Sequence, residues 1–426
     1  MIILFASMLL FFCLGIPIAF SVALSSCLFA IVSDINMIAV AQRIVNGADS
    51  FTLMAIPYFI LAGEIMNQGG ITQKLVNFAK VMIGRVRSGL CYVVILCNMI
   101  MAGVSGSSVA DACAIGAITV PAMEKSGYKR DFATALNGAA ATIGPIIPPS
   151  MGFVMYATIV GCSVGDLFVA GVAPGVLMGL TFALFCYVLG KKHNFPVSGE
   201  HATIKEKLIS FKDAFWALLM PVVIIVGILT GIVTPTEAAV LACVYGMFAA
   251  MVIYRTITFR DLPGILLRAA KSALTVMIIV ACASSFGWML TVEGTPQALV
   301  KMFTTMTEHK WVFMLALNVI FLVLGCFLDV DTLIIVFVPL LIPALKFFNV
   351  DLVYFGVVFT LNTMVGQLTP PVGELLYAVS SVGRTPVLKT AKAMFPFYIA
   401  LVINLILVTY IEPISLFLPR LFGYGG

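Results

Sequence analysis

The stretch that decides the fold reads Gly144-Pro-Ile-Ile-Pro-Pro149, and a related stretch in the second half of the chain reads Gly366-Gln-Leu-Thr-Pro-Pro371. Both lie inside strongly apolar segments. Proline removes a backbone N–H and clashes with the preceding turn, so these residues interrupt a helix. In a bilayer an interrupted backbone persists only where protein or a water-filled cavity satisfies its polar groups. The two stretches therefore predict two membrane helices that are broken at corresponding places.

The offset that takes Gly144 to Gly366 also relates further glycines and prolines, which indicates an internal repeat. The identical pairs are Gly103/Gly325, Pro121/Pro343, Gly144/Gly366, Pro148/Pro370, Pro149/Pro371, Gly161/Gly383 and Pro174/Pro396. Paired broken helices in the two halves of a membrane protein are the best sequence indicator of a transporter binding site.

Composition places the whole chain in a membrane. Of its 426 residues, 62% are hydrophobic and only 10% are charged, and the mean hydropathy is +1.13. Apolar stretches long enough to span a bilayer recur from end to end. The ten cysteines lie in apolar runs without Cys-x-x-Cys spacing, so their pattern implies neither a disulfide nor a metal-binding cluster. The fold class predicted is an all-α polytopic membrane protein.

The apolar pattern divides the chain into two inverted repeats, 1–190 and 235–426, joined by a cytoplasmic linker and connecting span, 191–234. The broken helices are expected at 131–161 and 351–382. Segments 88–124 and 311–347 each have two short apolar arms around a glycine-containing turn, which favours re-entrant hairpins; two ordinary antiparallel spans are the alternative. Full spans are expected at 2–32, 51–69, 166–190, 213–231, 235–254, 272–290 and 393–416, with short arms at 34–48 and 256–270 and amphipathic pieces at 72–84 and 296–307.

Basic residues set the expected orientation, because cytoplasmic loops carry an excess of Lys and Arg. With the N-terminus inside, five basic residues lie outside: Arg43, Lys301, Lys310, Lys346 and Arg420. The other nineteen lie in segments expected to be cytoplasmic. This bias predicts a first hairpin that opens inward, a second that opens outward and, after nine crossings, a periplasmic C-terminus.

The breaks have a chemistry of their own. A broken helix exposes carbonyl groups, which suit Na⁺, and positive helix N-termini, which suit a carboxylate. Ser105, Ser107 and Ser108 lie in the first hairpin turn, and the repeat offset pairs Ser107 with Asp329 in the second. The alternative is that glycine and serine only allow close helix packing.

Other polar residues within apolar segments are candidates because a charge at membrane depth is costly. Asp111, Asp329, Glu374 and Glu64 are the acidic ones, with Asp329 favoured. Asp331 and Glu374 are alternatively residues of an aqueous face, and Glu64 a partner of a lysine. Three polar residues of the broken helices are either packing contacts or ligands: Asn137, Asn362 and Gln367.

An enzyme is the competing class. Gly103-Val-Ser-Gly106 fits a short pattern found around intramembrane serine nucleophiles, which need a general base. The histidines, His193, His201 and His309, all lie in polar loops, so a serine hydrolase is disfavoured. Walker-type phosphate loops are absent from the sequence, a channel is less favoured than a carrier, and we expect no organic cofactor and no nucleic-acid partner.

Several of these segments resemble the large membrane subunit of tripartite ATP-independent periplasmic (TRAP) transporters. The resemblance covers the whole chain and rests on Ala48–Gly63, Gly103–Ser108, Ile146–Ser150, Thr234–Ala239 and Leu368–Gly373. It implies an elevator-type, Na⁺-coupled secondary importer of an organic acid in a bacterial inner membrane. It also implies two partners, a small four-helix membrane subunit, expected to be a separate chain, and a periplasmic substrate-binding protein.

The resemblance also implies site residues. One Na⁺ site would use Gly103, Ser105, Ser107, Gly144, Ile147 and Pro148. The second would use Gly325, Cys326, Gly366, Thr369 and Val372. The solute would lie between them, near Ser107, Ser150 and Asp329. Sialic acid is the first expectation and a C4-dicarboxylate the second. A stand-alone Na⁺/carboxylate carrier and a scaffold without flux remain alternatives.

Overall fold

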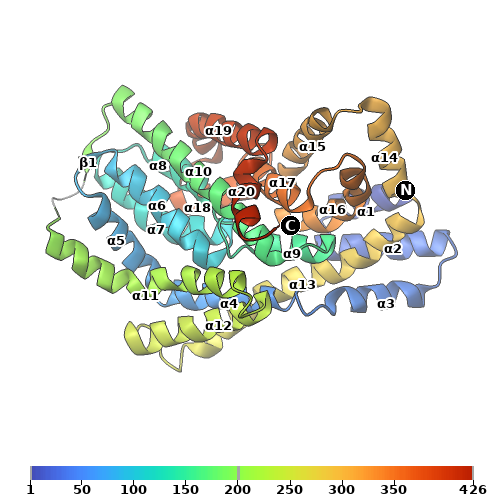
Figure 1. Cartoon of the computed structure of the whole chain (residues 1–426), viewed down its shortest axis with the longest axis horizontal. Coiled ribbons are helices and arrows are strands. Elements are labelled where there is room, and N and C mark those ends of the chain that lie inside the picture. Colours follow the sequence, from blue (N-terminus) through green and yellow to red (C-terminus); the bar gives the residue numbers. More distant parts are fainter. Residues whose placement is uncertain (1, 199–201, 425–426) are drawn as a thin grey trace.

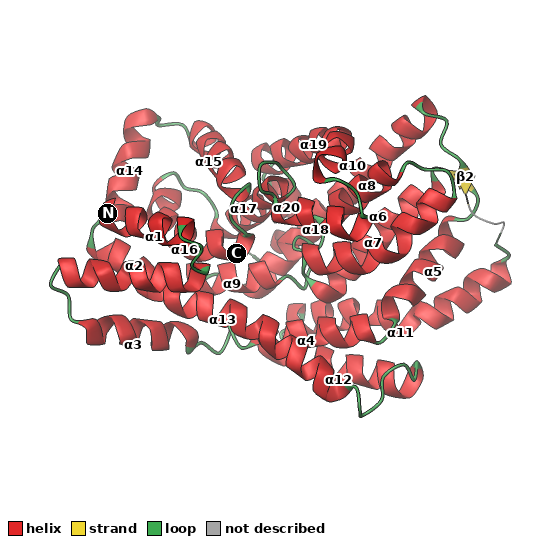
Figure 2. Ribbon diagram, turned by 180° about the vertical axis from the view of Figure 1, so that it is seen from behind, coloured by secondary structure: helices red, strands yellow, loops and turns green. Residues whose placement is uncertain are grey.

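The computed structural model describes residues 2–198 and 202–424, and the described chain is almost entirely helical (Figures 1 and 2). The helices of the first half are α1 (Ile2–Cys13), α2 (Ile18–Val32), α3 (Met37–Ala48), α4 (Ala55–Gln68), α5 (Ile71–Ile83), α6 (Gly89–Ser105), α7 (Ser108–Lys125), α8 (Arg130–Ala141), α9 (Met151–Val160) and α10 (Val164–Lys192). Helix α11 (Ile204–Leu229) connects the halves.

The second half repeats this pattern. Its elements are α12 (Pro235–Phe248), the short π-helical segment η1 (Ala249–Ile253), α13 (Leu262–Val292), α14 (Thr295–Met306), α15 (Lys310–Gly325), α16 (Val330–Phe347), α17 (Leu352–Gln367), α18 (Glu374–Gly383), α19 (Val387–Tyr410) and α20 (Pro413–Leu421). Two short strands, β1 (Val86–Arg87) and β2 (Val197–Ser198), pair antiparallel and tie the loop before α6 to the segment after α10.

Helix boundaries recur at the same offset that relates Gly144 to Gly366. Both ends of α16 match both ends of α7 at this offset, and the start of α17 matches the start of α8. The paired helices α6 and α15, and likewise α9 and α18, start within one position of it. The Pro148–Pro149 and Pro370–Pro371 peptide bonds are both cis. The repeat seen in glycine and proline positions therefore extends to the backbone.

A single span over residues 2–32 is a wrong prediction. Gly15 has a φ of +79° and Pro17 precedes α2, so the apolar stretch divides into α1 and α2. The two helices pack against each other, and the Ser25 hydroxyl donates to the Leu4 carbonyl at 2.6 Å. The expectation of a cytoplasmic N-terminus assumes that residues 2–32 cross the membrane as one straight helix. Because α1 and α2 fold against each other, they do not form that single crossing.

The separate arm at 256–270 and span at 272–290 are also wrong. Helix α13 runs without a break from Leu262 to Val292, because Arg268-Ala-Ala-Lys-Ser-Ala273 contains good helix formers and neither glycine nor proline. Its counterparts in the first half, α3 and α4, are divided by the turn-forming residues that begin at Asp49-Ser50. The repeats thus differ in the helices outside the broken core.

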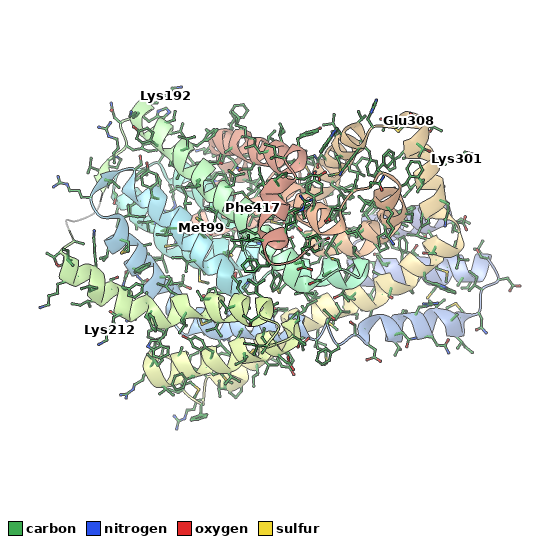
Figure 3. All side chains as sticks on the ribbon, in the orientation of Figure 1. Met99, Lys192, Lys212, Lys301, Glu308 and Phe417 are labelled. Atoms are coloured by element: carbon green, nitrogen blue, oxygen red, sulfur yellow. The ribbon has the colours of Figure 1, made fainter. Side chains whose placement is uncertain are left out.

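Six helical segments are long and apolar enough to cross a membrane within the described part of the chain: α10, α11, α12 with η1, α13, α16 and α19. Bent at 119°, α14 and α15 pass the same test as a pair. Figure 3 shows labelled charged side chains at both ends of the long axis, with Lys192 and Lys212 at one end and Lys301 and Glu308 at the other. The labelled charged residues thus lie at the two ends of the long axis, with the labelled Met99 and Phe417 between them.

The broken helices form the centre of the molecule. Every residue of α17 from Val353 to Gln367 is buried, and α8 is buried from Ala133 to Ala141. Helix α7 packs against α8 and against α18 of the other repeat, while α16 packs against α9. Each hairpin therefore contacts the broken helix of the opposite repeat, which brings the two turns and the two breaks together.

Candidate functional site

The first turn and the first break meet through glycine. Helix α6 ends at Ser105, and Gly106 adopts a φ of +61°. A Cβ on Gly106 would lie 2.4 Å from the carbonyl oxygen of Pro149, and one on Gly144 would lie 3.3 Å from the carbonyl carbon of Ser107. Only glycine at position 106 allows the backbone of the turn to approach the Pro149 carbonyl this closely. The structure therefore brings the turn and the break predicted for the first Na⁺ site together.

The remaining residues of this predicted set lie close by. A Cβ on Gly103 would be 3.7 Å from the Pro148 carbonyl oxygen, and the Ser107 hydroxyl accepts from the Ala110 N–H at 3.4 Å. The side chain of Ile147 instead packs under α10, where a Cβ on Gly175 would be 2.3 Å from it. Ile147 could therefore contribute to an ion site through its backbone only.

A buried carboxylate completes the first break. Asp111 is fully buried, and its Oδ1 accepts from the Ser105 hydroxyl at 2.5 Å. Across the described residues, its Oδ2 finds no hydrogen-bond partner, and a Cβ on Gly144 would lie 2.9 Å from that oxygen. Such an oxygen is costly unless a cation or donor reaches it. The sequence marks Asp111 as a charge at membrane depth but not as a member of the ion site.

The second turn and break are joined more tightly by backbone contacts. A Cβ on Gly366 would lie 2.6 Å from the carbonyl carbon of Gly325, and the Gly373 N–H donates to the Cys326 carbonyl at 2.9 Å. The hydroxyl of Thr369 donates to the Val365 carbonyl at 2.7 Å. The predicted second set therefore also assembles at one place.

The two breaks differ in charge and exposure. Leu333, fully buried, is the repeat counterpart of Asp111, so the second break lacks the equivalent buried carboxylate. Val372 is exposed and lines a cavity. The Tyr398 hydroxyl donates to the Leu368 carbonyl at 2.7 Å, so one carbonyl of this break is already occupied. The first break therefore has a buried carboxylate in direct contact with it, whereas the acidic residues at the second turn and break, Asp329, Asp331 and Glu374, line the cavity.

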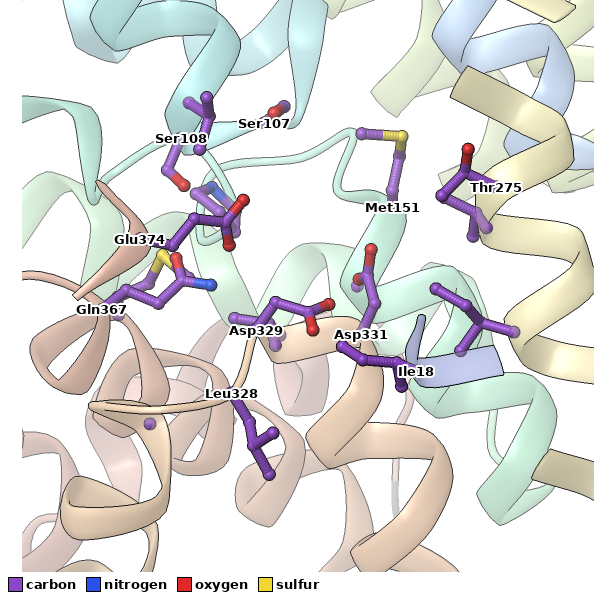
Figure 4. A pocket seen from close by; sticks show the side chains of 18 of the residues that line it. Ile18, Ser107, Ser108, Met151, Thr275, Leu328, Asp329, Asp331, Gln367 and Glu374 are labelled. Atoms are coloured by element: carbon purple, nitrogen blue, oxygen red, sulfur yellow. The ribbon is translucent and has the colours of Figure 1, made fainter. Parts of the chain in front are cut away.

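A cavity of about 620 Å³ lies between the two turns (Figure 4). The first turn contributes Ser107 and Ser108 to its lining, and the second contributes Asp329 and Asp331. The rest of the lining includes Gln367, Val372 and Glu374 at the second break and, on the opposite wall, Met151 of α9, Thr275 of α13 and Ile18 of α2. None of the described residues that line it is Lys, Arg or His.

Two of the three predicted solute residues line this cavity. Ser107 and Asp329 do, and each also caps a helix, Asp329 by accepting from the Thr332 N–H at 3.2 Å. Ser150 is fully buried, caps α9 by accepting from the Phe153 N–H at 3.2 Å, and is not among the residues of the cavity wall. Its place in the structure is thus behind the wall that Met151 and Gly152 form.

Four helix N-termini converge on the cavity. The first residues of α7, α9, α16 and α18, namely Ser108, Met151, Val330 and Glu374, all line it. A helix N-terminus carries a partial positive charge and free N–H groups, so it favours an anion. The cavity therefore combines attraction for an anion with acidic side chains on one wall.

Sequence reasoning does not decide the role of three lining residues, Asp331, Gln367 and Glu374. A single sequence does not show which face of a helix meets a cavity. The one feature of the sequence that points to these residues is their position beside the second turn and break. The side-chain amides of Asn137 and Asn362 donate to backbone carbonyls, of Ala112 at 2.8 Å and Asn318 at 2.9 Å, while the Oδ1 of each has no hydrogen-bond partner among the described residues.

A smaller cavity of about 260 Å³ shares Ser107, Met151, Val276 and Asp331 with the first. It extends along α4 to Glu64, whose carboxylate lies 3.6 Å from the Nε of Arg268. The partner of Glu64 is therefore an arginine of α13 and not a lysine. The smaller cavity thus lies beside the main one, against α4 and α13.

Interrupted helices that meet two turns around a cavity are typical of polytopic membrane carriers. The sequence model described as "Tripartite ATP-independent periplasmic transporter, DctM component" matches residues 5–414. The chain belongs to this family, the large permease subunits of TRAP transporters, and is accordingly a multi-span membrane protein of a bacterial transporter.

Similar proteins carry different solute names. The chain is 37% identical over 413 residues to the sialic acid TRAP transporter large permease protein SiaM of Vibrio cholerae, with 96% of each chain covered. It is 36% identical over 385 residues to the C4-dicarboxylate TRAP transporter large permease protein DctM of Pseudomonas aeruginosa, with 90% of each covered. Among solved structures, the YdaH transporter of Alcanivorax borkumensis shares the fold, with a TM-score of 0.62, 13% identity and coverage of 91% of this chain and 88% of that one.

These relatives bear on the enzyme alternative. The relatives named above are permeases, and the Ser105 hydroxyl is bonded to the carboxylate of Asp111 rather than to a histidine. A nucleophilic serine needs a base that can take its proton and then return it. The geometry and the relatives together favour transport over hydrolysis.

Proposed function

We propose that this protein is the permease subunit that imports an organic acid by coupling it to Na⁺. The observation that carries the proposal is the pairing of each helix break with the turn of a hairpin, at Gly106–Pro149 and Gly325–Gly366. Each pairing places helix C-terminal carbonyls beside helix N-termini. Carbonyls suit a hard cation and N-termini suit a carboxylate.

Na⁺ acts here as a co-transported substrate. At the first break, Asp111 supplies a carboxyl group next to Gly144, Ser105 and Ser107. At the second, the ligands available are backbone oxygens around Gly325, Cys326, Gly366, Thr369 and Val372. Two Na⁺ entering with one monoanion carry a net charge of +1, which the membrane field favours by about 2.3 kcal/mol per 100 mV.

The solute occupies the cavity between the two breaks. Ser107 and Asp329 touch it from the two turns, and Ser150 acts from behind by capping α9. Because ions and solute share the same turns, binding of Na⁺ orders the residues that hold the solute. Movement of this core, α6–α9 with α15–α18, against the outer helices would carry both across the membrane in an elevator mechanism.

Two partners complete the proposed assembly. A periplasmic binding protein would deliver the solute, and a small four-helix membrane subunit would lie against the outer helices. We propose that the lysine-rich end with Lys192 and Lys212 is cytoplasmic in the bacterial inner membrane (Figure 3). This places the end with Lys301 on the side from which the binding protein would approach.

Uptake in proteoliposomes tests the proposal. The two membrane subunits are reconstituted, the co-encoded binding protein is added outside, and labelled N-acetylneuraminate and succinate are offered with Na⁺ or choline. Na⁺-dependent uptake that requires the binding protein is the expected result. Na⁺-dependent uptake without it would indicate a stand-alone carrier, and an absence of flux under every gradient would indicate a scaffold.

A further inference from the structure

A pocket of about 380 Å³ lies at the junction of three elements, the end of α4, the loop after η1 and the start of α13. Two hydrogen bonds fix this loop against neighbouring segments. The Thr256 hydroxyl donates to the Gly69 carbonyl at 2.7 Å, and the Tyr254 hydroxyl donates to the Asp213 carbonyl at 2.8 Å. Asp213 follows Lys212, so the pocket belongs to the lysine-rich end of the molecule, where Figure 3 labels Lys212.

Two arginines line the pocket. Arg260 comes from the loop and is exposed, and its side chain forms no hydrogen bond or ion pair within residues 2–198 and 202–424. Arg268 lies back along α13 over Gly264, where a Cβ would stand 3.5 Å from the Nη1 of the arginine. The Nε of Arg268 is 3.6 Å from the carboxylate of Glu64, which is longer than a hydrogen bond. Both guanidinium groups are therefore open to a further ligand.

The charge around the pocket is positive. The segment from Tyr254 to Lys271 carries four basic residues, namely Arg255, Arg260, Arg268 and Lys271. Its acidic residue is Asp261, whose Oδ2 already accepts from the N–H and the hydroxyl of Thr258, at 2.8 and 2.7 Å. Glu64, beside Arg268, is a second acid. Four positive charges against two negative ones leave a net attraction for an anion.

Large apolar side chains next to the pocket face outward. Phe259, which precedes Arg260, is 80% exposed, and Leu266 and Leu267 on α13 are more than half exposed. Exposed apolar side chains beside basic ones are typical of a segment at the surface of a bilayer. Helix α13 has 31 residues, whereas about 20 cross the hydrocarbon core, so part of this helix extends into the headgroup region. The arginines mark its start as that part.

We propose that this pocket binds the phosphate group of an anionic phospholipid from the cytoplasmic leaflet. Guanidinium groups match phosphate oxygens in geometry and in charge, and basic pockets between membrane helices at the cytoplasmic side suit lipid headgroups. The phosphate contacts Arg260 and Arg268, and the acyl chains lie against Phe259, Leu266 and Leu267. Positive charge directly beside exposed apolar surface selects a lipid over a soluble anion. The leaflet follows from the orientation proposed above.

Titration with short-chain lipids tests the assignment. The complex of large and small subunits in dodecyl maltoside is heated with dioctanoyl phosphatidylglycerol, dioctanoyl phosphatidylcholine or sn-glycerol 3-phosphate. A ligand that binds only the folded state raises the midpoint of thermal unfolding. Phosphatidylglycerol should raise it saturably, at a concentration at least tenfold below the one that phosphatidylcholine requires. Glycerol 3-phosphate, which has the phosphate without acyl chains, should also require at least ten times more.

Variants then test the named residues. Arg260→Gln and Arg268→Gln should each raise the half-saturating concentration of phosphatidylglycerol at least fivefold. Gly264→Leu fills the pocket without changing the charge and should weaken binding to a similar extent. Leucine favours a helix more than glycine does, so α13 should persist in this variant. Lys271→Gln is the matched control, because it removes one exposed positive charge of α13 outside the pocket wall, and it should change the concentration less than twofold.

The contrary outcomes are distinct. If phosphatidylglycerol does not raise the midpoint, or phosphatidylcholine raises it as effectively, the protein recognises no anionic headgroup and the proposal fails. A loss of binding in Lys271→Gln as large as that in Arg260→Gln would mean that the charge of the whole surface, rather than the pocket, attracts the lipid. Unchanged binding by Gly264→Leu would place the lipid elsewhere. Binding of glycerol 3-phosphate as tight as that of phosphatidylglycerol would assign the pocket to a soluble phosphate ester instead.

Discussion

Gly325 and Gly366 lie in direct backbone contact, and a Cβ on Gly366 would stand 2.7 Å from the Cα of Gly325. The two residues come from the end of α15 and the end of α17, so the contact holds the second turn against the second break. In the first repeat the corresponding glycines are Gly103 and Gly144. The first turn and the first break approach each other less closely at these glycines, since a Cβ on Gly144 would lie 3.3 Å from the carbonyl carbon of Ser107. A side chain at position 366 would separate groups that we assign to one ion.

The first prediction concerns this contact. Gly366→Ala should reduce Na⁺-dependent uptake by at least tenfold, because overpacking at a closed contact costs about 1–3 kcal/mol and displaces the carbonyls. Gly287→Ala is the matched control, since nothing lies within 4 Å of a Cβ there. Uptake is compared at equal membrane abundance. Wild-type uptake by the Gly366 variant would show that the contact does not shape an ion site.

The second prediction concerns the buried carboxylate at the first break. Asp111→Asn keeps a hydrogen bond to Ser105 and removes the charge facing Gly144. The Na⁺ concentration for half-maximal uptake should rise about tenfold, equivalent to about 1.4 kcal/mol, while the solute dependence at saturating Na⁺ changes little. The measurement is uptake against Na⁺ concentration. An unchanged Na⁺ dependence would mean that Oδ2 of Asp111 serves no cation.

The third prediction separates solute from cation at Asp329. Because this residue lines the cavity and lies at the N-terminus of α16, Asp329→Asn should raise the half-saturating solute concentration several-fold and leave the Na⁺ dependence unchanged. Asparagine also caps helices well, so α16 should persist. The reverse pattern, a shifted Na⁺ dependence alone, would move Asp329 from the solute to an ion.

The fourth prediction concerns orientation. Cysteines introduced at Lys192 and Lys301, in a background without native cysteines, should react with a membrane-impermeant reagent from opposite sides, the first only from the cytoplasm. Lys301 suits this purpose better than Lys310, whose Nζ is paired with Glu412 at 2.5 Å. Labelling of both positions from the periplasm would contradict the proposed orientation of the two ends.

The broken core could be predicted from sequence, and the outer helices could not. Glycine and proline have few roles inside apolar segments, so Gly144, Pro148, Gly366 and Pro370 located both breaks and the repeat. Apolar runs do not reveal whether a helix continues. For that reason residues 2–32 looked like one span although Gly15 divides them, and α13 looked like two.

The site was predictable only in part for a related reason. Backbone contacts follow from glycine positions, and Ser107 and Asp329 follow from the repeat. Whether a polar side chain faces a cavity or a neighbouring helix depends on the packing of distant elements. Ser150 caps α9, and Asp111 faces the break, because of contacts that no local pattern encodes.

The most direct test is the dependence of uptake on Na⁺ and membrane potential. Proteoliposomes with both membrane subunits and the binding protein are given an outward K⁺ gradient with valinomycin, which makes the inside negative, and initial uptake is measured as external Na⁺ replaces choline. Coupling at two breaks predicts a sigmoidal rise with Na⁺, with a Hill coefficient above one, and faster uptake at negative potential. Equal uptake in choline and in Na⁺ would contradict the account.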